Sequence, residues 1–293
     1  ELNVYDRSSV EETPDRIRDA EAVMTNKALL LADIILAAPR LKYIGVMATG
    51  YNVVDLKAAA SKGIVVTNVP AYSTPAVAQL AFAFMLELAN RTAAYAQSVA
   101  DGDWVKSLDF SYSIAPITEL RDKTLGVVGL GRIGQDVARI GLAFGMKVIA
   151  SHKHPKRDRM EGVTFVDQAT LFSTADFVTL HCPLNEANKE FVNRDLLRTM
   201  KPSAFLVNTS RGPLIHEQDL ADALRAGVIA GAALDVLSVE PPAPDNPLLS
   251  APRCLVTPHI GWATLESRSR LMEVVTRNLR SFQAGSPVNV VGN

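Results

Sequence analysis

Short apolar segments alternate with helical stretches along most of this 293-residue chain, and this alternation restricts its possible folds most strongly. The segments are brief and rich in Val and Ile, which favours strands over buried helices. Strands that alternate with helices predict βαβ units and a parallel sheet. The expected strands are Ala22–Thr25, Tyr43–Ala48, Val65–Asn68, Thr124–Val128, Lys147–Ala150, Phe177–His181, Ala204–Asn208, Gly231–Val236 and Cys254–Thr257.

Composition excludes several classes of protein. The 30 basic and 31 acidic residues nearly cancel, so nothing favours binding to nucleic acid or to an anionic membrane. No apolar run approaches the roughly 20 residues that a membrane helix needs. The two cysteines, Cys182 and Cys254, cannot form a disulfide framework, and no metal-ligand spacing is present, so no metal is expected. These features are typical of a cytoplasmic protein.

The length predicts about two domains of roughly 100–200 residues each. Ser73-Thr74-Pro75 is a helix start. The Ala-rich run that follows, to Ala94, is expected to be either a helix that connects the domains or a plain core helix. A second long helix is expected at Thr264–Gln283. Because the first residue is Glu1 rather than Met, we expect the natural chain to begin earlier.

A glycine motif follows the expected strand at Thr124–Val128 and precedes a helical pattern. The glycines are Gly129, Gly131 and Gly134, in the spacing GxGxxG. In this context the first allows a tight turn, the second lets backbone approach a pyrophosphate, and the third lets helix pack on strand. The helix N-terminus supplies N–H donors to the phosphates. The motif therefore predicts a dinucleotide site.

The strand after this helix should end beside the ribose of that dinucleotide. An NAD site usually places Asp or Glu there, about 20 residues past the motif, whereas this chain has His152. Ser151, Lys153 and Lys156 surround it with a hydroxyl and cations, which suit a 2′-phosphate. We therefore favour NADP(H). NAD(H), with the basic run merely solvated, remains the alternative.

Three residues that can act together in catalysis follow other expected strands. Arg211 follows Ala204–Asn208, Glu240 lies in the Pro-rich loop after Gly231–Val236, and His259 follows Cys254–Thr257. The carboxyl ends of parallel strands form one edge, where ligands bind. An Arg can pair with a carboxylate and polarise a ketone, a His can deliver a proton, and a carboxylate can orient that His. These residues suit hydride transfer to a 2-keto acid.

These residues and several longer segments resemble the D-isomer-specific 2-hydroxyacid dehydrogenase family over almost the whole chain. The matching segments are Ala48–Asp55, Gly129–Gly134, Leu180–Leu184, Leu206–Gly212, Ala233–Val236 with Glu240-Pro241, and Thr257–Gly261. The resemblance implies an α/β fold of two Rossmann-like domains, one flavodoxin-like and one dinucleotide-binding, with parallel sheets and an active-site cleft between them. It places residues 1–91 and 262–293 in the substrate-binding domain and residues 92–261 in the dinucleotide-binding domain.

The resemblance also implies roles for individual residues. Arg211, Glu240 and His259 would be catalytic, and Thr49 and Gly50 would bind the substrate carboxylate together with Arg211 and His259. Asp235 would hold the nicotinamide carboxamide. Further cofactor-lining positions would be Val77, Arg132, Ile133, His181, Pro183, Asn188, Thr209 and Gly261. Family members are commonly dimers, so a homodimer is expected.

Within the family, the segments at 49–55 and 68–72 resemble glycerate dehydrogenases, also called hydroxypyruvate reductases, and the run at 151–156 resembles NADPH-using glyoxylate/hydroxypyruvate reductases. We therefore expect reduction of hydroxypyruvate or glyoxylate to the D-2-hydroxy acid, and the reverse oxidation. The alternatives are another D-2-hydroxyacid dehydrogenase, a phosphite dehydrogenase, or a dinucleotide-sensing protein similar to the C-terminal-binding corepressors.

Overall fold

A computed structural model describes residues 1–292 of the chain, which divides into two compact units. The terminal unit comprises Glu1–Ser73 and Ala263–Asn293, and the central unit comprises Thr74–Trp262. The central unit is thus one uninterrupted stretch of chain, and the terminal unit is formed by both ends.

The terminal unit contains a three-stranded parallel sheet in the order β1-β2-β3. Its strands are β1 (Ala22–Thr25), β2 (Tyr43–Val46) and β3 (Val65–Thr67), and its helices are α1 (Thr13–Ile17), α2 (Ala32–Ala37), α3 (Leu56–Ser61) and α11 (Leu265–Gln283). The long helix α11 packs on β2, where the rings of Tyr43 and Phe282 have centroids 4.7 Å apart. Asn278 of α11 donates a hydrogen bond from its side chain to the carbonyl of Asn68. The two ends of the chain are therefore joined within one unit.

The central unit contains a seven-stranded, wholly parallel sheet in the order β10-β9-β8-β7-β4-β5-β6. Its strands are β4 (Thr124–Val128), β5 (Lys147–Ser151), β6 (Val163–Phe165), β7 (Phe177–Leu180), β8 (Phe205–Asn208), β9 (Gly231–Leu234) and β10 (Cys254–Val256). From β4, the strands β5 and β6 are added on one side of the sheet, and β7 to β10 are added on the other side. This is the strand order of dinucleotide-binding folds, whose ligands lie outside the carboxyl ends at that switch point.

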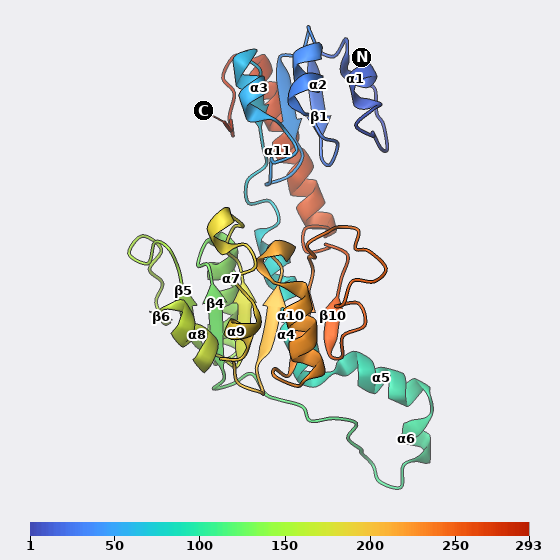
Figure 1. Cartoon of the computed structure of the whole chain (residues 1–293), viewed down its shortest axis with the longest axis vertical. Helices are drawn as coiled ribbons and strands as arrows, with labels where there is room; N and C mark the ends of the chain where they lie inside the picture. The colour runs from blue at the N-terminus through green and yellow to red at the C-terminus, as the bar shows by residue number, and fades with distance from the viewer. Residues whose placement is uncertain (293) are drawn as a thin grey trace. The chain divides into compact units, whose positions relative to one another are not determined.

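Helices cover both faces of this sheet (Figure 1). One face carries α4 (Thr74–Asn90) and α7 (Arg132–Ala143); the other carries α8 (Gln168–Thr174), α9 (Arg194–Leu197) and α10 (Glu217–Arg225). The strands β4, β7 and β9 are consequently apolar and buried along their whole length or nearly so.

An arm projects from the central unit between α4 and β4. It contains α5 (Thr92–Ala100), α6 (Asp103–Lys106) and an extended return segment, and Figure 1 shows it leading away from the sheet. Hydrogen bonds within the arm join its helices to the return segment. The Tyr95 hydroxyl donates to the carbonyl of Ala115, and the Trp104 indole donates to the carbonyl of Phe110.

The predicted α/β fold with parallel sheets is confirmed. Every expected strand is present within two residues at its ends, and the structure adds β6, a short edge strand with no distinctive sequence pattern. The expected helix through Ala94 is interrupted at Arg91, which has a positive φ of 53° and separates α4 from α5.

The boundary between the units differs from the expected one at residue 91. It lies at Ser73 because α4 belongs to the central unit, where its Phe82 and Met85 share a buried cluster with Leu125 and Val137. The second boundary lies between Trp262 and Ala263. Within residues 1–292, no helix combines the length and apolar character required to cross a membrane.

Candidate active site

The glycine loop follows β4 and leads into α7 at the switch point of the central sheet. Gly129 has a φ of +94°, and a Cβ on it would lie 2.7 Å from the backbone nitrogen of Cys182, at the end of β7. A Cβ on Gly134 would lie 2.1 Å from the carbonyl oxygen of Gly129. Both positions therefore require glycine for close backbone approach.

Gly131 differs from the other two glycines. It precedes α7, its φ is −74°, and a Cβ on it would meet no atom within 4 Å. The space in front of the helix N-terminus is therefore open, where the first N–H groups of α7 lack intrahelical partners. This is the environment that a pyrophosphate requires.

Two buried polar atoms near this edge have no hydrogen-bond partner among the described residues. They are Nδ1 of His181, after β7, and Oγ1 of Thr209, after β8. Burial lowers the pKa of His181 to about 3, so its ring is neutral near pH 7. Because unpaired buried polar atoms are costly, these two atoms fit a site that a bound ligand completes. With the open space at Gly131, they show that the residues present suit a dinucleotide.

His152, at the end of β5, is held within the protein at both ring nitrogens. Its Nδ1 accepts a hydrogen bond from the N–H of Leu130 at 3.1 Å, and its Nε2 lies 2.6 Å from Oδ2 of Asp158. The tautomer with a proton on Nε2 satisfies both contacts. His152 therefore fixes the glycine loop against the segment after β5.

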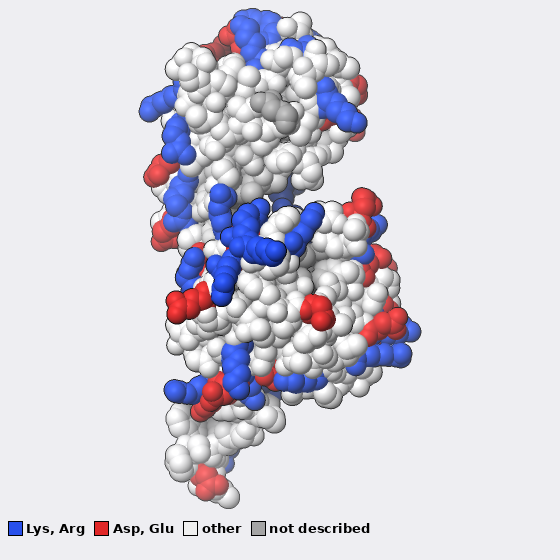
Figure 2. Space-filling view, turned by 90° about the vertical axis from the view of Figure 1, so that its left-hand side faces the viewer, with Lys and Arg blue, Asp and Glu red and all other residues white. Residues whose placement is uncertain are grey.

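Asp158 is a carboxylate that directly follows the basic run after β5. The guanidinium of Arg157 contacts it at 2.6 Å and, together with the hydrogen bond from His152, holds the pKa of Asp158 well below its ordinary value. The exposed Lys153 and Lys156 make no ion pair within residues 1–292 and remain available to an anion. Figure 2 shows Lys and Arg side chains gathered at one end of the central unit, viewed from the side of β5 and β6.

The turn that carries His259 is built around the buried carboxylate of Asp235, at the end of β9. Its Oδ1 accepts hydrogen bonds from the Thr257 hydroxyl at 2.6 Å and the Ile260 N–H at 2.7 Å. Its Oδ2 accepts one from the Gly261 N–H at 2.7 Å. This wrapping holds His259 at a positive φ of 54°, uncommon for a residue with a side chain.

His259 and Glu240 form a direct pair. Nδ1 of His259 lies 2.7 Å from Oε2 of Glu240, and both side chains are about one-third exposed. The other carboxylate oxygen, Oε1, accepts a hydrogen bond from the N–H of Leu237 at 3.2 Å. The pair leaves Nε2 of His259 without a partner among the described residues, which is the arrangement of an imidazole oriented for proton transfer.

Arg211 projects from the loop after β8, the strand next to β9. Its side chain is exposed, and Nη1 donates to the carbonyl of Ser210 at 2.7 Å. Asn208 holds this loop by donating to the Arg211 carbonyl and accepting from the Ser210 N–H, both at 2.9 Å. A Cβ on Gly212 would lie 1.9 Å from the carbonyl carbon of Leu237, so the loops carrying Arg211 and Glu240 are in backbone contact.

The other predicted positions fall in two places. In the central unit, Gly261 lies beside Val77 and Asp235, and Pro183 accepts a hydrogen bond from the Asn188 side chain at 2.8 Å. Thr49 and Gly50 lie in the terminal unit, where the Asn68 side chain donates to the carbonyl of Thr49 at 2.8 Å.

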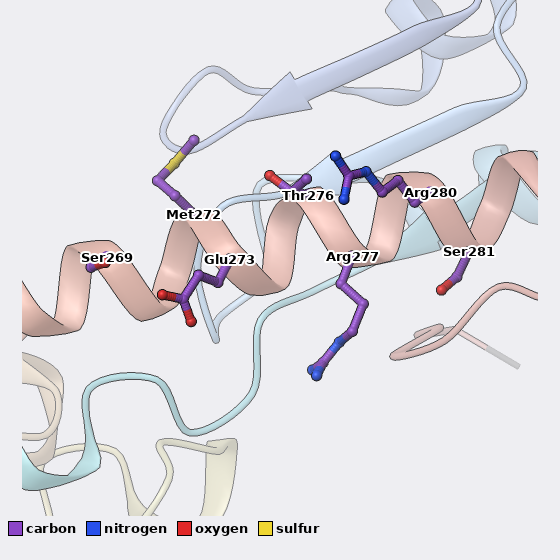
Figure 3. A pocket seen from close by; sticks show the side chains of 7 residues that line it. All are labelled: Ser269, Met272, Glu273, Thr276, Arg277, Arg280 and Ser281. Atoms are coloured by element: carbon purple, nitrogen blue, oxygen red, sulfur yellow. The ribbon is translucent and has the colours of Figure 1, made fainter.

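A hollow of about 530 Å³ lies along α11 in the terminal unit, and Figure 3 shows its lining side chains projecting from the helix. The lining residues are Ser269, Met272, Glu273, Thr276, Arg277, Arg280 and Ser281. None of them is a predicted site residue. The polar geometry of the central sheet edge, rather than this hollow, identifies the candidate site.

Two carboxylates near the site could not be assigned a role from the sequence. Asp158 lies in a run of basic residues, and only the fold of that run brings it against His152. Glu217 opens α10 and binds both Ser238 and Asn246 through its two oxygens. An acidic residue in the first turn of a helix is commonplace, so the sequence carries no signal for that connection.

The strand order and glycine loop define a Rossmann-type dinucleotide-binding unit. Residues 82–261 match the model of the NAD-binding domain of D-isomer specific 2-hydroxyacid dehydrogenases. A hydroxypyruvate reductase of Blautia hydrogenotrophica is 45% identical over 296 residues, which cover 99% of this chain and 92% of the relative. A glycerate dehydrogenase of Methylorubrum extorquens is 40% identical over 96% of this chain and 88% of the relative.

A solved structure gives the same result for the fold. An acyclic imino acid reductase in complex with NADPH and D-Arg matches with a TM-score of 0.87 and 33% identity, over 98% of this chain and 91% of that chain. The chain belongs to the D-isomer specific 2-hydroxyacid dehydrogenase family, as its motifs predicted. It is therefore an oxidoreductase whose cofactor is a nicotinamide dinucleotide.

Substituting Gly131 and Gly134 separates binding from folding. Gly131→Ala should change the free energy of unfolding by less than about 1 kcal/mol, because the methyl group meets no atom. It should weaken dinucleotide binding by about tenfold or more, because the methyl group enters the space for the pyrophosphate. Gly134→Ala should lower the free energy of unfolding by about 1–3 kcal/mol, since its methyl group meets the backbone of Gly129. Urea unfolding and fluorescence titration measure both; equal dinucleotide affinity in Gly131→Ala and the wild type would contradict this assignment.

Proposed function

We propose that this chain is an NAD(P)H-dependent reductase of small 2-keto acids, hydroxypyruvate and glyoxylate, which yields D-glycerate and glycolate and catalyses the reverse oxidation. The Glu240–His259 pair carries the proposal: an imidazole held at Nδ1 by a carboxylate, on the sheet edge that also bears the glycine loop and Arg211. The names of the two relatives support the choice of substrate.

The proposed roles follow from the geometry. A bound nicotinamide dinucleotide supplies the hydride. Glu240 fixes the ring of His259 through Nδ1, so that Nε2 delivers a proton to the carbonyl oxygen. Arg211 pairs with the substrate carboxylate and polarises the ketone through its planar group of donors. We assign carboxylate binding also to the backbone at Thr49 and Gly50, in a loop that Asn68 orders.

We propose that the site prefers NADP(H). Lys153 and Lys156 support this preference, since both are exposed cations just after β5, where the ribose 2′ substituent is expected. His152 supports cofactor binding indirectly: its ring nitrogens contact Leu130 and Asp158, so it positions the glycine loop rather than the phosphate. Asp158 is neutralised by Arg157, which limits its repulsion of a phosphate.

The experiment that tests the function is a matrix of substrates and cofactors. We expect the highest kcat/KM with hydroxypyruvate or glyoxylate, above that with pyruvate and phosphite, and higher values with NADPH than with NADH. Dinucleotide binding without turnover of any substrate would instead indicate a sensing protein. A strong NADH preference would overturn the cofactor proposal alone. In Lys153→Ala/Lys156→Ala, the NADPH preference should fall by about tenfold or more, while the kcat/KM with NADH stays near the wild-type value.

Variants of the proposed catalytic residues test the mechanism. His259→Ala should lower kcat by a factor of roughly 10²–10⁴, because it removes the ring that Glu240 holds in place to deliver the proton. Arg211→Lys should raise KM and lower kcat, since an ammonium cannot reproduce the planar donor geometry. Steady-state kinetics at saturating cofactor, with dinucleotide affinity as the control, measure both. Full turnover in His259→Ala would remove His259 from the mechanism.

We propose a homodimer formed through the arm at 92–118. The arm exposes large apolar side chains, including Val105 and Phe110 at 90% each and a fully exposed Leu108. An apolar surface of this kind on a segment that projects from its own unit indicates a protein partner, and a second copy offers the same surface under twofold symmetry.

Leu108→Asp/Phe110→Asp should therefore convert the dimer to a monomer, because two carboxylates would be buried at the contact. Analytical ultracentrifugation measures the change, and Leu249→Asp, an exposed position outside the arm, is the control that should remain dimeric. A monomeric wild type would overturn the proposal.

A further inference from the structure

One carboxylate outside the proposed catalytic group connects the two ends of the loop that carries Glu240. Glu217 is the first residue of α10. Its Oε1 accepts a hydrogen bond from the backbone N–H of Ser238 at 2.6 Å, and its Oε2 accepts one from Nδ2 of Asn246 at 2.7 Å. Ser238 and Asn246 flank the segment that contains Glu240 and three prolines.

The loop between these two contacts has little support of its own. Residues 239–243 are exposed or half-buried. Glu240 is held by the N–H of Leu237 at 3.2 Å and by His259 at 2.7 Å. Unlike a strand or helix, such a segment gains no order from a regular hydrogen-bond ladder. Its geometry therefore depends on how its ends are fixed.

The helix behind Glu217 is a rigid support. Leu220 and Leu224 of α10 are buried in the core beneath it. The ring of His216 caps the helix by accepting from the N–H of Asp219 at 3.3 Å, and Asp219 accepts from the N–H of Arg194 at 2.9 Å. A carboxylate in the first turn is also favoured by the helix dipole. Glu217 is thus held in a fixed position, and its two hydrogen bonds fix the ends of the loop.

We propose that Glu217 is a positioning residue for Glu240, and through Glu240 for the ring of His259. This inference rests on the catalytic roles proposed above for Glu240 and His259. Glu217 does not touch the reacting atoms; it holds the ends of the loop so that Oε2 of Glu240 stays within hydrogen-bond distance of Nδ1 of His259.

The two contacts of Glu217 require a carboxylate, because each of its oxygens accepts one hydrogen bond. Both of its partners are donors, so a glutamine can accept from only one of them and turns its NH₂ toward the other. Asn246 cannot compensate by rotating its amide, because its Oδ1 already accepts from the N–H of Leu248 at 3.0 Å. Glu217→Gln therefore breaks one of the two contacts with almost no change in volume.

The first test compares Glu217→Gln and Asn246→Ala, one on each side of the connection. We expect kcat for keto-acid reduction to fall by about tenfold or more in each, while dinucleotide affinity and the urea midpoint stay near the wild-type values. The loss should appear in kcat rather than in KM for the keto acid, as in Glu240→Gln, because Glu217 touches neither the substrate nor the reacting atoms. Gln218→Ala, on the exposed side of the same helical turn, is the matched control and should change neither.

The second test is a double-mutant cycle with Glu240→Ala. If Glu217 acts through Glu240, Glu217→Gln should have no further effect on kcat in that background. An undiminished effect there would assign Glu217 a general structural role and overturn the inference. Wild-type kcat in both Glu217→Gln and Asn246→Ala, with Glu240→Ala impaired, would overturn this inference and leave the proposed catalytic roles in place. A fully active Glu240→Ala would overturn the proposed catalytic roles and this inference together.

Discussion

The buried carboxylate of Asp235 is the interaction on which the candidate site depends. A charge in this position is tolerated because three donors satisfy it: the hydroxyl of Thr257 and the N–H groups of Ile260 and Gly261. These donors can reach one carboxylate only if the chain turns sharply at His259, which accounts for its positive φ. The backbone position of His259 is thus set at the end of β9, and Glu240 then fixes the orientation of the imidazole.

The loops at the carboxyl edge hold one another in the same manner. The Ser210 hydroxyl donates to the carbonyl of Cys182 at 2.6 Å, which joins the loops after β8 and β7. Gly212 allows backbone contact with Leu237, and His152 joins the glycine loop to the segment after β5. Since parallel strands end at a common edge, a few short contacts suffice to order residues that are far apart in sequence.

Much of the fold could be predicted from sequence because its signals are local. Strands such as Thr124–Val128 are continuous apolar runs, and the motif of Gly129, Gly131 and Gly134 has a separate steric reason at each glycine. The boundary at Ser73 could not be predicted in this way. The sequence of α4 is apolar on most sides, so it does not reveal which unit the helix packs against.

By itself, the sequence determined the parallel α/β architecture, the dinucleotide motif, and the presence of Arg211, Glu240 and His259 after strands of one sheet. It did so because strand patterns and motif spacing depend on neighbours in the chain. Only the tertiary structure decided that Asp158 faces His152 and that Glu217 joins Ser238 to Asn246. Those contacts depend on where loops and a helix terminus meet in space, which no spacing of residue types along the chain encodes.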